Sequence, residues 1–144
     1  SFTVIGDGGR KNELIVSIDG DCIELLSPMN RSDLIEAYQK ADVLFLHLND
    51  YPAFKKVLPS KIFEYAALGK PIWAGVAGYA AQFLEDEVDN CAIFNPGDIE
   101  GAIQSFSMLN VIDIDRFEFK EKYSRRVIMK NMAEDLLEFG RNVQ

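Results

Sequence analysis

The chain has 144 residues, of which 48% are hydrophobic and 26% are charged, a composition typical of one soluble globular domain. Fifteen Lys and Arg residues stand against 23 Asp and Glu residues, so the formal net charge is −8. This charge argues against a non-specific binder of nucleic acid or of anionic membranes, because such polyanions would be repelled over most of the surface.

Cysteine and histidine are too scarce for a fold that is stabilised by a metal ion or by disulfide bonds. Cys22 and Cys91 lie far apart, no Cys-x-x-Cys motif occurs, and His47 is the one histidine. We therefore expect no structural zinc site and no disulfide framework, and we expect a reduced cytosolic setting. No apolar run approaches the ~18 residues of a membrane span. Because the sequence opens almost directly on a strand, we also expect a piece of a longer protein.

In chain order, apolar runs of strand length alternate with helical patterns. We predict strands at residues 2–5, 22–26, 43–48, 72–76 and 91–94, and helices at residues 11–17, 33–40, 61–68, 79–85 and 99–109. The alternation favours an α/β fold, a Rossmann-like parallel sheet flanked by helices, within one domain over residues 1–144.

The tail from residue 115 onward breaks the alternation and has a helical pattern alone. Phe117 and Phe119 lead into a short helix that we expect to end near Tyr123. In a longer helix, apolar residues recur at helical spacing, and Gly140 is placed to stop it. These residues are Val127, Ile128, Met132, Leu136, Leu137 and Phe139. We expect most of them to pack on their own domain, although the stripe is also suited to a partner surface.

Ligands of open parallel sheets bind where loops leave the carboxyl ends of the strands. The first such loop is Gly-Asp-Gly-Gly at residues 6–9, where Gly6 and Gly8 would let the backbone approach a phosphate or a sugar. The dinucleotide fingerprint needs a third glycine where this chain has Lys11. A plain tight turn is therefore an equally good interpretation.

The most informative segment is residues 59–71. We expect Pro59 to stiffen the entry to a helix that Ser60 caps, so that the first-turn amides form an anion site. Ser60, Lys61 and Glu64 share one helical face, with Phe63, Ala66 and Ala67 on the face toward the sheet. Donors for phosphates and a carboxylate for ribose hydroxyls would suit a nucleoside diphosphate. Alternatively, Glu64 is a solvated residue that pairs with Lys61.

The other loops are less specific. Residues 49–58 form a long loop with the doubled lysine Lys55 and Lys56, next to the predicted anion site. His47 is interpreted as a core histidine near the site. The glycines of residues 74–78 suit either a ligand or tight packing, and Asp98 is expected to cap the next helix.

The segment Pro-Ser-Lys-Ile-Phe-Glu-Tyr-Ala-Ala-Leu-Gly-Lys-Pro-Ile at residues 59–72 resembles the nucleotide-binding helix in the C-terminal domain of GT-B glycosyltransferases. It is most similar to the family 4 retaining enzymes of bacterial polysaccharide synthesis. Val-Ile-Gly-Asp-Gly at 4–8, Ala-Asp-Val at 41–43 and Pro-Gly-Asp at 96–98 resemble further segments of that family, in the same order.

The resemblance implies that Glu64 holds the ribose of a nucleotide-sugar, with UDP the expected nucleotide. It implies that the amides around Pro59, Ser60 and Lys61 hold the diphosphate. It further implies contacts from Gly6 and Gly8, a glycan or lipid-linked acceptor, and no metal or other cofactor. The whole enzyme would be cytoplasmic, or peripheral at the inner membrane face. The C-terminal helices of this chain resemble the last helix of the family, which crosses back to the other domain.

Two departures from the family pattern limit what this chain would do alone. The residue eight positions before Glu64 is Lys56, where the family has a glutamate that contacts the donor sugar. Lys56 is expected to serve the phosphates instead. The family's Arg and Lys pair, its acceptor-binding N-terminal domain and the first strand and helix of the donor domain all lie outside this chain. We therefore expect nucleotide binding without turnover, and we assign no catalytic residue.

Residues at specific positions argue for or against other classes of protein. A sugar-nucleotide epimerase of the same architecture would place acids and several histidines in its domains, whereas this chain has His47 alone. A response-regulator receiver would need an acidic pair after the first strand, where this chain has Gly-Asp-Gly. A non-catalytic interaction module remains an alternative, and it would show no nucleotide affinity.

Overall fold

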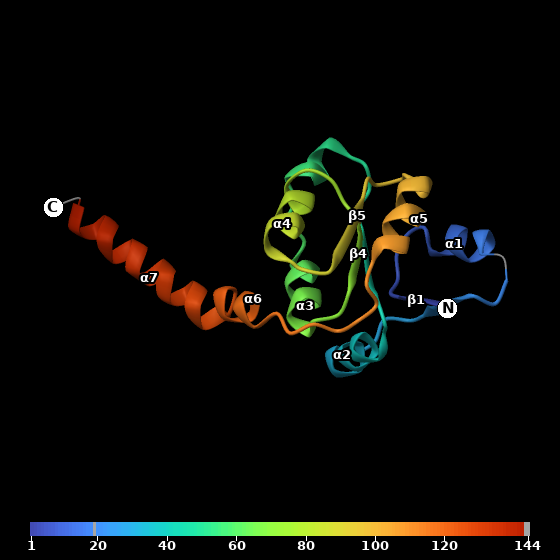
Figure 1. Ribbon diagram of the computed structural model, residues 1–144, viewed down its shortest axis with the longest axis horizontal. Helices are drawn as coiled ribbons and strands as arrows, with labels where there is room; N and C mark the ends of the chain where they lie inside the picture. The colour runs from blue at the N-terminus through green and yellow to red at the C-terminus, as the bar shows by residue number, and fades with distance from the viewer. Residues whose placement is uncertain (19, 143–144) are drawn as a thin grey trace. The chain divides into compact units, whose positions relative to one another are not determined.

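The computed structural model describes residues 1–18 and 20–142, and these residues form five β-strands, seven α-helices and one 3-10 helix (Figure 1). The prediction of an α/β, Rossmann-like fold is confirmed, since parallel strands alternate with helices. The chain divides into two compact units, Ser1–Tyr38 and Gln39–Gln144, which we describe separately.

The first unit holds β1 (Phe2–Ile5), α1 (Lys11–Ser17), β2 (Ile23–Leu26) and most of α2 (Arg31–Lys40). The two strands pair in parallel, with Phe2 opposite Ile23 and Ile5 opposite Leu26. Tyr38 is buried, but none of the described residues before it is. Helix α1 in particular has no buried residue. Few apolar contacts therefore hold this unit together.

Helix α2 begins before the predicted start at residue 33 because Asn30 caps it. The Asn30 side-chain oxygen accepts a hydrogen bond from the Asp33 amide at 3.0 Å, and its amide group donates to the Asp33 carboxylate at 2.8 Å. This reciprocal pair satisfies a first-turn amide, as an N-cap does. The cap signal was present in the sequence at Asn30, and the prediction missed it.

The second unit is built on β3 (Leu44–His47), β4 (Ile72–Gly75) and β5 (Cys91–Phe94), parallel in the order β3-β4-β5. Side chains alternate between the faces of a strand, so Leu44, Leu46, Ile72 and Ala74 share one face, where each is buried. The opposite face carries Trp73, whose indole nitrogen donates to the Ser105 hydroxyl at 3.1 Å.

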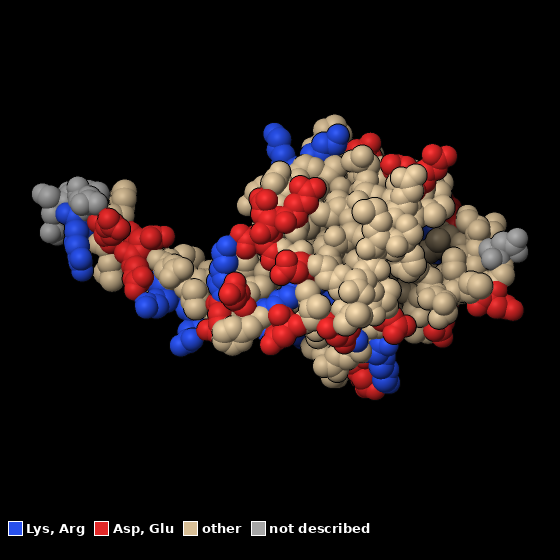
Figure 2. Space-filling view, in the orientation of Figure 1, with Lys and Arg blue, Asp and Glu red and all other residues tan. Residues whose placement is uncertain are grey.

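Helices cover both faces of this sheet. Figure 1 shows α3 (Ser60–Leu68) and α4 (Tyr79–Glu87) on one side of the strands and α5 (Ile99–Met108) on the other. Ile62 of α3 and Leu84 of α4 are completely buried, whereas Ile103 of α5 is exposed. Figure 2 shows acidic groups gathered over α4 and a broad uncharged area over α5.

The connection between α5 and α6 (Phe117–Lys122) is irregular, yet a buried arginine fixes it. Arg116 is 5% exposed. Its guanidinium donates to the main-chain oxygens of Ala66, Lys70 and Asp89 at 2.5–3.2 Å. These carbonyls end α3 and precede β4 and β5, so one side chain ties three segments together. Burial lowers the pKa of Arg116, because it disfavours the charged form. The surrounding carbonyl oxygens are acceptors, so they can bond all the donors that the guanidinium directs at them.

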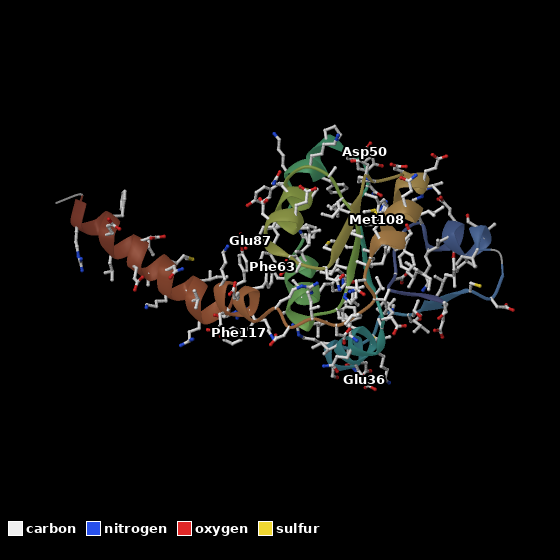
Figure 3. The ribbon with its side chains drawn as sticks, in the orientation of Figure 1. Glu36, Asp50, Phe63, Glu87, Met108 and Phe117 are labelled. Atoms are coloured by element: carbon white, nitrogen blue, oxygen red, sulfur yellow. The ribbon has the colours of Figure 1, made fainter. Side chains whose placement is uncertain are left out.

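Helix α6 is held against α3 and α4 by aromatic rings. Phe119 and Tyr123 lie against Phe63 and Phe83, with ring centroids 5.3–6.4 Å apart (Figure 3 labels Phe63). Lys122 donates to the Glu87 carboxylate at 2.6 Å, which lowers the pKa of Glu87 and raises that of Lys122.

Helix α7 (Arg125–Asn142) corrects one prediction about the tail. It continues through Gly140, so the prediction that Gly140 stops the helix is wrong. Every side chain from Ile128 to Arg141 is exposed, so the expectation that the apolar stripe packs on its own domain is also wrong for those positions. Over the part of the chain that the structure describes, no helix has the length and apolar character needed to cross a membrane.

Candidate functional site

The start of α3 is set by proline geometry rather than by a serine cap. Pro59 is the N-cap, with φ −66° and ψ 136°, and the helix begins at Ser60 without a side-chain cap. The Pro59 oxygen accepts the amide hydrogen of Ile62 at 3.1 Å. The prediction of Ser60 as the cap is therefore wrong by one position, because the fixed φ of Pro59 suits the extended cap residue. The first-turn amides still carry the positive end of the helix dipole.

The accessible side of α3 carries the predicted polar group. Ser60 and Lys61 are exposed, Glu64 is half-buried one turn further on, and the Lys61 ammonium lies 5.9 Å from the Tyr65 ring centroid. The structure thus places all three predicted side chains among the first five residues of one short helix.

The face of α3 toward the sheet differs from the prediction. It consists of Ile62, Tyr65 and Ala66, which are buried. Ala67 is exposed, and Phe63 packs on the aromatic rings of α4 and α6 instead. The shift is one helical position, because the amphipathic pattern of nine residues allows two neighbouring orientations and only the partner surfaces choose between them.

The connection that precedes α3 is more ordered than expected. Residues 52–56 form a 3-10 helix, η1 (Pro52–Lys56). The Lys55 ammonium lies 3.7 Å from the carboxylate of Asp50, which is labelled in Figure 3. The Lys55 main chain lies against Gly78. Gly78 has φ +67°, and a side chain there would collide with Lys55, so glycine is required.

Lys56 differs from its neighbour. It is exposed, and no ion pair or hydrogen bond joins its side chain to the described residues. Its ammonium group is therefore available to an anion, four positions before the first residue of α3.

His47 is not a core residue, contrary to the prediction. It is exposed at the end of β3, with its ring centroid 6.1 Å from those of Phe45 and Phe94. Gly75 lies on β4, between His47 of β3 and Phe94 of β5. A side chain at this position would clash with the rings of both residues. This glycine therefore serves tight packing, which was one of the two interpretations of residues 74–78.

In the first unit, the glycine loop forms a turn into α1. The Gly8 amide donates to the Asp7 carboxylate at 2.9 Å, and the Lys11 amide donates to the Gly8 oxygen at 3.1 Å. The loop borders a cavity of about 540 Å³. Gly6 and Gly8 belong to this unit, whereas Pro59, Ser60, Lys61 and Glu64 belong to the second.

Cys91 and the possible metal-ligating side chains also bear on the chemistry that the chain could perform. Burial raises the pKa of the Cys91 thiol to about 12, so it is protonated and a poor nucleophile at neutral pH. Within residues 1–18 and 20–142, no three or more His, Cys, Asp or Glu side chains are grouped to hold a metal ion.

The comparisons add no relative. The chain matches no protein-family model, no curated protein and no solved structure.

Proposed function

We propose that this chain is the donor-nucleotide-binding domain of a glycosyltransferase. The reaction would move a sugar from a nucleotide-sugar, with UDP the expected nucleotide, to a glycan or lipid-linked acceptor. One observation supports it most: Ser60, Lys61 and Glu64 lie on the accessible side of a helix whose amino end follows the carboxyl end of β3. That edge is where parallel α/β sheets bind their ligands.

The chemistry of these groups suits a nucleoside diphosphate. First-turn amides, the Ser60 hydroxyl and the Lys61 ammonium are donors for phosphate oxygens, with Lys56 as a further cation. The Glu64 carboxylate would accept hydrogen bonds from two ribose hydroxyls. The contacts predicted from the sequence for Gly6 and Gly8, which belong to the first unit, stay a prediction.

The same groups would favour sugar transfer. When the bond between the sugar and the diphosphate breaks, negative charge develops on the departing phosphate. Donors that are already oriented toward that charge stabilise the transition state more than the bound substrate. The acceptor domain and the basic pair that the resemblance implies would complete the enzyme, which we propose acts in the cytoplasm or at the inner membrane face.

A second function has one observation in its favour. The exposed apolar side chains of α7, such as Leu136 and Phe139, would suit a non-catalytic interaction module. Such a module would have no affinity for nucleotides.

Calorimetric titration of the chain with UDP, GDP, ADP and CMP tests the proposal. We expect one nucleotide to bind, and Glu64→Gln to weaken it by ~1–3 kcal/mol, the contribution of a hydrogen bond to a charged group. Glu85→Gln is the matched control, since Glu85 is an exposed glutamate of α4. Equal affinity in wild type and Glu64→Gln would refute the ribose role of Glu64, and no binding by any nucleotide would refute the function.

A further inference from the structure

Helix α7 carries an apolar row with the spacing of a coiled-coil seam. Met129, Met132, Leu136 and Phe139 follow one another at intervals of three, four and three residues, which is the a and d pattern of a heptad. All four are 53–71% exposed, although apolar side chains gain free energy when they are covered. The row is therefore an apolar strip along the helix that the described residues of this chain leave accessible to a partner.

The opposite side of α7 is largely charged. Lys130, Glu134 and Arg141 share it with Leu137, because these positions recur at intervals of four, three and four residues. The Lys130 ammonium lies 3.7 Å from the Glu134 carboxylate on this side. Such a surface suits water, so a partner would cover the apolar strip alone.

The charges of α7 are also separated along its length. Residues 125–133 contain three cations and no acidic residue, whereas residues 134–142 contain three acidic residues and one cation. Figure 2 shows these basic and acidic groups on separate stretches of the helix. The basic residues are Arg125, Arg126, Lys130 and Arg141, and the acidic residues are Glu134, Asp135 and Glu138. A helix that complements α7 would carry its charges in the reverse order.

The same helix of a second copy, running antiparallel, has both properties. Met129 then lies opposite Phe139 of the second copy, and Met132 lies opposite Leu136, so that a positions meet d positions along the whole strip. The basic half of each helix faces the mainly acidic half of the other, whereas parallel pairing would bring like charges together.

We propose that α7 pairs antiparallel with α7 of a second copy of this chain, and that the chain dimerises through this strip. The pairing uses no residue of the proposed nucleotide site, so it is independent of the proposed function.

Sedimentation velocity of the chain from about 10 µM to about 1 mM tests the dimer, a range that includes the weak association expected of a short seam. Leu136→Glu places a charge in the strip at a position that is 67% exposed, so the fold should tolerate it. Leu137→Glu is the matched control, since it makes the same change at the next residue, which is 62% exposed and lies on the charged side.

We expect wild type and Leu137→Glu to dimerise as the concentration rises. Leu136→Glu should raise the dissociation constant at least about tenfold, because it would bury an unpaired carboxylate in the seam. A wild-type chain that stays monomeric throughout the range would overturn the inference, as would an equal effect of the two substitutions.

Disulfide trapping tests the direction of the helices, in a Cys22→Ser background because Cys22 is exposed. Antiparallel pairing holds each Met129, and each Phe139, about 15 Å from its counterpart, which is ten positions along the helix and too far for a disulfide. Met129→Cys and Phe139→Cys should therefore stay unlinked when oxidised separately and form a covalent dimer when mixed. Covalent dimers of either variant alone, with none gained on mixing, would show parallel helices and refute antiparallel pairing.

Discussion

At the scale of single residues, Arg116 ties separate segments of the second unit together. Its guanidinium is buried and bonded to carbonyl oxygens that belong to three different segments. A guanidinium has five N–H donors in a fixed plane, so one residue can satisfy several carbonyls that an apolar side chain would leave unbonded.

Replacing Arg116 with alanine should lower the free energy of unfolding by about 3 kcal/mol, because buried carbonyl oxygens then lose their donors. Urea denaturation followed by circular dichroism measures this. Arg126→Ala is the control, since the Arg126 side chain is 85% exposed and its change should stay within about 0.5 kcal/mol. Similar transition midpoints for the two variants would contradict the role of Arg116.

At the scale of elements, helix ends show which local signals decide a boundary. Asp98 was predicted as a cap, and its carboxylate accepts the Gly101 amide hydrogen at 2.9 Å, which confirms the prediction. Ser60 was predicted on the same grounds, but the preceding Pro59 takes the cap position. A cap residue therefore has to be judged together with the residue before it.

Asp98→Ala should destabilise the second unit by about 1 kcal/mol, the usual effect of losing an N-cap side chain. Thermal unfolding would show it as a lower midpoint. Asp98→Asn should retain most of the stability, because an asparagine oxygen can accept the same amide hydrogen. If asparagine and alanine are equally destabilising, the cap is not the cause.

At the scale of the whole molecule, burial is distributed unevenly between the two units. Among the residues of the first unit that the structure describes, none before Tyr38 is buried, whereas Ile72, Ala74 and Leu84 of the second unit are fully buried. A unit of 38 residues is also shorter than most domains that fold without a partner or a staple.

Amide hydrogens of β1 and β2 should therefore exchange with solvent at least about tenfold faster than those of β4, because local opening exposes little apolar surface there. Hydrogen–deuterium exchange read by mass spectrometry measures both in one sample. The exposed start of α7 is an internal reference for fast exchange. Equal protection of β1 and β4 would show that the first unit is stabilised by contacts that its burial does not reveal.

Local periodicity and spacing are enough to predict the α/β class, the order of strands and helices, and the grouping of Ser60, Lys61 and Glu64 on one helix. The other features follow from tertiary contacts. Which face of α3 is buried, the exposure of His47, the clamp at Arg116 and the division into two units depend on residues far apart in the chain. Nucleotide binding remains a prediction from the chemistry of the site. A local pattern defines which face could be buried, but only the surface that packs against it determines which one is.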